Sequence, residues 1–131
     1  MSAVLDTNIL IFDTFEDSQL HKLAHSTLDQ LEKWIIPAIV FHEYVWFMKA
    51  EKIELDFTKT KLKEYLMNAK TIYATIESTD ILFTSREIKD HKEYNDFLIL
   101  SVSKRLEQPL FTYDNPLRKA CQRLGIKILS Q

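Results

Sequence analysis

Residues 3–10 of the chain read AVLDTNIL, a short apolar run that ends in an acid and continues into a second apolar segment. Ala3-Val4-Leu5 is predicted to be a buried strand, and the segment from Ile9 to Phe15 a short helix. Asp6 therefore lies at the carboxyl end of a strand, which is where parallel α/β sheets place the residues that bind ligands.

The rest of the chain alternates in the same way. Further strands are predicted at residues 34–36, 71–76, 110–113 and 126–129, and helices at residues 18–33, 38–51, 57–69, 80–90, 97–106 and 116–124. Short apolar strands separated by helices indicate an α/β fold with a mostly parallel, buried sheet. One glycine and three prolines leave little room for linkers, so residues 1–131 are expected to form a single domain.

The composition excludes several classes of protein. With 46% hydrophobic and 27% charged residues, the chain is expected to be globular, and its net charge of −2 argues against binding nucleic acid through bulk charge. A lone cysteine excludes an internal disulfide and fits a reducing cytoplasm. The longest apolar run, residues 34–41, is much shorter than the ~20 residues of a membrane helix, and no cleavable signal is expected.

Three further acids lie next to or within apolar segments of the sequence. Asp114 follows the predicted strand at residues 110–113, just as Asp6 follows the first strand. Glu43 lies within a very apolar helix, where a charge is costly unless something compensates it. Asp96 directly precedes the apolar run of another helix. Two acids are thus expected at strand ends, and two on the helices that flank them.

Each of these acids also has a purely structural explanation. Asp6 and Asp114 could cap the helices that follow them, Asp96 could favour the positive end of its helix, and Glu43 could form a buried salt bridge. Taken together, however, the four carboxylates would repel one another in one cleft, and each would raise the pKa of the others. A hard divalent cation removes that penalty, and an all-oxygen site selects Mg²⁺ or Mn²⁺.

Four segments, in this order along the chain, resemble the acidic motifs of PIN-domain ribonucleases, and specifically of the small VapC-type toxins: LDTNIL at residues 5–10, PAIVFHE at 37–43, YNDFLI at 94–99 and LFTYD at 110–114. The resemblance covers essentially the whole chain. It implies one PIN domain whose sheet has about five strands in the order 3-2-1-4-5. It also implies Mg²⁺- or Mn²⁺-dependent hydrolysis of RNA phosphodiesters, a cognate antitoxin and usually a homodimer.

The same resemblance suggests a role for each motif residue. The catalytic and metal-binding residues would be Asp6, Glu43, Asp96 and Asp114. Asn8 and Thr112 would orient carboxylates or bound waters from behind these ligands.

Other interpretations remain open beside this one. A catalytically silent PIN-like module that binds RNA or protein is the main rival. A haloacid-dehalogenase-type phosphatase would need a second aspartate where this chain has Asn8. Arg118, Lys119 and Arg123 could contact RNA phosphates or could be solvated surface residues, and only Arg118 and Lys119 are expected near the cleft. His21 and His25 share a helix face, but they are expected to be solvated because no third metal ligand is evident nearby.

Overall fold

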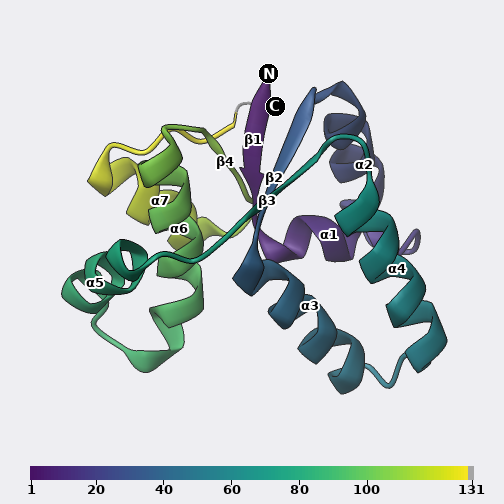
Figure 1. The fold of residues 1–131 in the computed structure, drawn as a ribbon. Helices are drawn as coiled ribbons and strands as arrows, with labels where there is room; N and C mark the ends of the chain where they lie inside the picture. Colours follow the sequence, from purple (N-terminus) through teal and green to yellow (C-terminus); the bar gives the residue numbers. More distant parts are fainter. Residues whose placement is uncertain (130–131) are drawn as a thin grey trace.

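The computed structural model describes residues 1–129 and contains a parallel four-stranded sheet in the order β3-β2-β1-β4 (Figure 1). The strands are β1 (Ser2–Leu5), β2 (Lys33–Pro37), β3 (Thr71–Ala74) and β4 (Leu110–Phe111). The predicted parallel sheet and its strand order are confirmed. The strand expected at residues 126–129 does lie beside β4, but it pairs there through a single bridge between Leu110 and Ile128, so the sheet has four strands rather than five.

Helices cover both faces of the sheet (Figure 1). On one face lie α5 (Ser78–Glu87), α6 (Tyr94–Leu106) and α7 (Asn115–Leu124), and on the other α1 (Thr7–Thr14), α2 (His21–Gln30) and α4 (Leu55–Met67). Helix α3 (Ala38–Ala50) continues directly from the end of β2, and a short 3-10 turn, η1 (His91–Glu93), precedes α6. No helix formed by residues 1–129 is long and apolar enough to cross a membrane.

The core is built around β1 and α6. Ala3, Val4 and Leu5 are fully buried because helices cover both faces of the central strand. The segment 97–103 of α6 is buried on every side, and α6 packs against β1. Asp6 and Asp96 lie at the ends of these two buried segments, so the hydrophobic core holds their backbone positions.

Several predicted elements extend beyond those observed, and two of them have a clear structural reason. The helix expected at residues 18–33 spans only His21–Gln30, because Lys33 and Trp34 belong to β2 and pair with β1. The strand expected at residues 110–113 ends at Phe111. Beyond it the Thr112 hydroxyl accepts a hydrogen bond from the backbone N–H of Asp114, which turns the chain into α7.

One acid outside the four motifs, Asp80, is fully buried and belongs to a different part of the molecule. Asp80 is fully buried in α5, where it accepts hydrogen bonds from Ser101 Oγ at 2.8 Å and from the guanidinium of Arg105 at 3.2 and 3.1 Å, both on α6. Asp80 also accepts a hydrogen bond from the backbone N–H of Glu77 at 2.9 Å. Because its charge is compensated in full, Asp80 is a structural acid that fastens α5 to α6.

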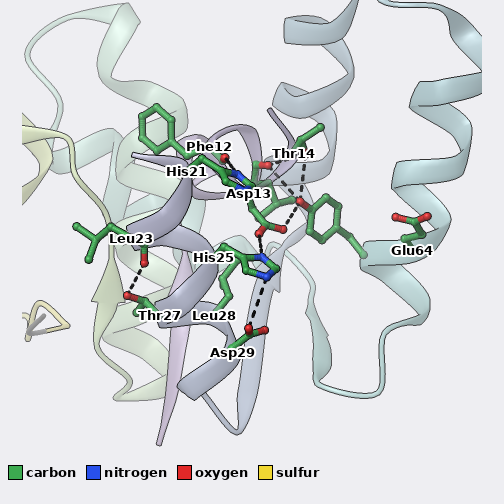
Figure 2. Close-up of polar contacts among 12 residues, drawn as sticks. Phe12, Asp13, Thr14, His21, Leu23, His25, Thr27, Leu28, Asp29 and Glu64 are labelled. Carbon is green, nitrogen blue, oxygen red and sulfur yellow. Dashed lines mark hydrogen bonds and ion pairs between the residues drawn. The ribbon is translucent and has the colours of Figure 1, made fainter. Parts of the chain in front are cut away.

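A polar network joins α1, α2 and α4 on the other face (Figure 2). The carboxylate of Asp13 accepts a hydrogen bond from Tyr65 Oη at 2.7 Å and contacts His25 Nδ1 at 2.8 Å. This contact with Asp13 raises the pKa of His25. His21 Nδ1 lies 2.9 Å from the carbonyl oxygen of Phe12. The two histidines therefore link α2 to α1. His25 is nevertheless solvated as expected, with 58% of its side chain exposed, whereas His21 is half-buried.

Candidate active site

The four predicted acids converge at the carboxyl edge of the sheet. Asp6 directly follows β1, Asp114 lies just beyond β4, Glu43 lies on α3 after β2, and Asp96 is in the first turn of α6. The charges of Glu43 and Asp114 raise the pKa of Asp6, and the charges of Asp6, Asp114 and Glu43 raise the pKa of Asp96. Residues as far apart in sequence as 6 and 114 thus form one electrostatic cluster.

Asp6 is the most enclosed member of the cluster, with 3% of its surface exposed. Its Oδ1 accepts a hydrogen bond from the backbone N–H of Thr7 at 2.8 Å, and its Oδ2 accepts one from Thr112 Oγ1 at 2.6 Å. The pKa of Asp6 is raised to about 6, mainly by burial and also by the charges of Glu43 and Asp114, against the opposing effect of the two hydrogen bonds. Asp6 caps α1 and also belongs to the cluster, so the two explanations of its position are compatible.

Asp96 is the acid whose charge is least compensated. Burial, together with the charges of Asp6, Asp114, Glu43 and Glu93, raises its pKa to about 7. No hydrogen bond or ion pair with another residue in 1–129 offsets these effects. A carboxylate with so raised a pKa binds a proton or a cation readily near neutral pH.

Glu43 is not the buried salt-bridge partner that its apolar helix allowed. Its Oε1 accepts a hydrogen bond from Thr7 Oγ1 at 2.5 Å, and its Oε2 accepts one from Asn95 Nδ2 at 3.2 Å. Asp114 caps α7 by accepting a hydrogen bond from the backbone N–H of Leu117 at 2.9 Å. Within the described part of the chain none of the four acids is paired with a lysine, arginine or histidine, in contrast to Asp80.

Supporting residues differ in part from those expected. Thr112 lies between Asp6 and Asp114 and bonds to both. Asn8 is exposed and, among residues 1–129, makes no hydrogen bond to the cluster, so its role as an orienting residue stays a prediction. Sequence reasoning missed Thr7 and Asn95, which both hold Glu43. Each of them is next in sequence to a motif acid, Asp6 or Asp96, and this adjacency is the signal that could have revealed them.

The chemistry of the cluster fits a hard divalent cation. All the donor atoms of the cluster are carboxylate oxygens, and none of them has a cationic partner in the described chain. The raised pKa values of Asp6 and Asp96 show that their ionised forms are disfavoured in the absence of a cation. No three His, Cys, Asp or Glu side chains of residues 1–129 stand close enough together to form a ready-made metal site. Separate hydrogen bonds hold two of these carboxylates, since Thr7 and Asn95 donate to Glu43 and Thr112 donates to Asp6.

Fold and site define an α/β protein whose parallel sheet carries an acidic cluster at its carboxyl edge. A family model for the PIN domain matches residues 3–122, and the chain belongs to this family. No curated protein sequence matches the chain.

Two solved structures share the fold over nearly their whole length. One is the toxin VapC20 of Mycobacterium tuberculosis, described as cleaving the sarcin-ricin loop, with 10% sequence identity and a TM-score of 0.79 over 98% of this chain and 99% of that one. The other is VapBC2 from Rickettsia felis, solved with a DNA fragment from its promoter, with 18% identity and a TM-score of 0.68 over 99% and 98% of the two chains. At these identities the likeness concerns the fold.

Proposed function

We propose that the protein is a metal-dependent endoribonuclease that hydrolyses RNA phosphodiester bonds and acts as the toxin of a toxin–antitoxin pair. The observation that carries this proposal is a cluster of four carboxylates at the carboxyl edge of a PIN-domain sheet, none of which has a cationic partner among residues 1–129. The fold shared with VapC20 supports the choice of RNA as substrate, because that toxin is described as cleaving the sarcin-ricin loop.

The side chains of the site would have two roles, which are to bind metal ions and to orient the metal-binding carboxylates. Asp6, Glu43, Asp96 and Asp114 would hold one or two Mg²⁺ or Mn²⁺ ions. Such an ion, when bound, lowers the pKa of a coordinated water and offsets the charge that develops on the phosphate. Thr112 fixes the orientation of the Asp6 carboxylate through its hydrogen bond to Oδ2. Single-stranded RNA is the expected substrate class, because its backbone can bend into a cleft that a stiff duplex cannot enter.

The proposal extends to partners. VapBC2 is named as a two-component system, which supports a cognate antitoxin for this chain as well. A homodimer in the cytoplasm is the expected assembly, and the free thiol of buried Cys121 is compatible with a reducing compartment.

A silent PIN-like binding module is the second candidate. The observation that favours it is the spacing of the carboxylates, which form no ready-made metal site among residues 1–129. Such a module would bind RNA or protein without cleaving either.

Metal-dependent cleavage separates the two candidates. Purified protein, freed of antitoxin, is expected to cut single-stranded or loop RNA in the presence of Mg²⁺ or Mn²⁺ and to stop when EDTA is added, because the carboxylates alone cannot activate water or neutralise the phosphate. Product formation is followed on labelled RNA by gel electrophoresis. RNA that is bound but left intact at every tested concentration of Mg²⁺ and Mn²⁺ would favour the silent module.

A further inference from the structure

A groove of about 290 Å³ runs between α6 and α7 and opens beside the acidic cluster. Asp96 belongs to both features, since it lines the groove and interacts with the other three acids. The two helices lie side by side on one face of the sheet (Figure 1). A molecule bound at the acidic cluster can therefore extend into this groove without leaving the protein surface.

The floor of the groove is apolar and well packed. It includes Phe97, Leu117 and Ala120, which are buried, while the exposed ring of Pro116 lies at its edge. Small-molecule sites commonly measure roughly 300–1,000 Å³, and this groove is just below that range, so it has room for only a small group. It fits one flat apolar group of the size of a nucleobase, because such a group gains both contact area and stacking on an apolar surface.

The two walls of the groove carry opposite charges. Lys119 and Arg123, one turn apart on α7, line one wall, and Glu93 and Asp96 line the other. Lys119 is exposed and has no ion pair or hydrogen bond among residues 1–129. Arg123 contacts Glu87 at 3.6 Å but keeps 54% of its side chain exposed.

Arg118 does not line the groove, and its guanidinium binds the backbone instead. Its Nη1 donates a hydrogen bond to the carbonyl oxygen of Thr112 at 3.0 Å, so it holds the turn between β4 and α7. The cations available to a ligand of the groove are therefore Lys119 and Arg123, whereas the sequence placed Arg118 and Lys119 nearest the cleft.

We propose that this groove binds the nucleotide next to the cleaved phosphodiester, with its base on the apolar floor and its phosphate on Lys119 and Arg123. The inference deepens the proposed ribonuclease function and rests on it. A nucleotide matches the groove because it joins a flat apolar base to a negatively charged phosphate. The acidic wall repels that phosphate and so directs it toward α7.

Removing the Lys119 charge tests the phosphate contact. Lys119→Ala is expected to raise the enzyme concentration that gives the half-maximal single-turnover rate on RNA by ~3–10-fold, with the maximal rate kept within about twofold. It should also reduce the slope of log affinity against log salt concentration by about 0.7, because one phosphate contact is lost. The matched control is Lys127→Ala, since Lys127 lies with Met1 and Pro109 at the opposite edge of the sheet, and this variant should behave as the parent does.

Filling the floor tests the base contact. Ala120→Leu should weaken binding of normal RNA, but it should have no effect on RNA made abasic at the nucleotide beside the cut, because no base then competes for the space. If the parent cleaves RNA while Lys119→Ala keeps the parental affinity and salt slope, the groove inference is wrong and the nuclease proposal stands. If Lys119→Ala instead lowers the affinity for an antitoxin and leaves the affinity for RNA unchanged, the groove binds protein and the inference is also wrong. A parent that cleaves no RNA contradicts the nuclease proposal itself.

Discussion

Replacing Asp96 with asparagine is expected to abolish RNA cleavage and to leave the metal-free protein at least as stable as the parent. The change removes a charged ligand without altering volume, so the rate should fall by at least ~10³-fold, which corresponds to about 4 kcal/mol in the barrier. Burial and four neighbouring acids raise the pKa of Asp96 to about 7, so its negative charge destabilises the metal-free fold. At pH 8 the neutral asparagine should raise the free energy of unfolding by ~1 kcal/mol, a value that allows for solvent screening at a half-buried group.

The same substitution at Asp80 provides the control. Asp80 is bound to Arg105 and Ser101, so Asp80→Asn breaks a compensated contact and should lower the free energy of unfolding. Chemical unfolding of both variants, together with RNA cleavage, measures this contrast. An Asp96→Asn protein that unfolds readily would make Asp96 a structural acid like Asp80. An Asp96→Asn protein that cleaves at the parental rate would assign the activity to a contaminant.

Mn²⁺ is expected to stabilise the folded protein strongly. A ligand that binds only the folded state contributes ~2.7 kcal/mol at a hundredfold excess over its Kd, which corresponds to a rise of roughly 10 °C in Tm for a domain of this size. Asp6→Asn should reduce the rise, because it removes a buried carboxylate from the cluster. Thermal unfolding across millimolar Mn²⁺ tests this, and a Tm that does not move would contradict a cation site at the four acids.

Adding metal should remove most of the pH dependence of stability that Asp6 and Asp96 cause. In the metal-free protein the pKa values of Asp6 and Asp96 are raised to about 6 and about 7, whereas in the unfolded chain they lie near 4. Between pH 4 and 7 the folded state therefore binds more protons than the unfolded state, so stability falls as pH rises. Because Mn²⁺ competes with those protons, the stabilisation by Mn²⁺ should grow from pH 5.5 to pH 8.

Much of the fold could be predicted because its signals are local. The apolar run before Asp6 indicates a buried strand, and Pro116 and Gly125 mark the beginning and the end of α7, where Gly125 takes a left-handed φ of 71°. The single bridge at Ile128 could not be foreseen, because an apolar segment shows only that it is buried and not how many backbone pairs it makes.

The acids of the site were predictable, but their supports were not. An acid beside an apolar run is visible in the sequence, whereas the hydrogen bond from Thr7 to Glu43 joins residues 36 positions apart and depends on how α1 and α3 pack. The inward turn of Arg118 likewise depends on where the carbonyl group of Thr112 points after β4 ends. Contacts of this kind are set by tertiary packing and not by residue type.

The position of a bound Mn²⁺ ion tests the central claim most directly. Crystals of the protein grown with Mn²⁺ would give an anomalous difference map in which the ion identifies its own ligands. The account predicts a peak roughly 2.0–2.3 Å from carboxylate oxygens of Asp6 and Asp96, with Glu43 and Asp114 bound directly or through water. A map without a peak at the carboxyl edge of the sheet, from protein that cleaves RNA under the same Mn²⁺ concentration, would contradict it.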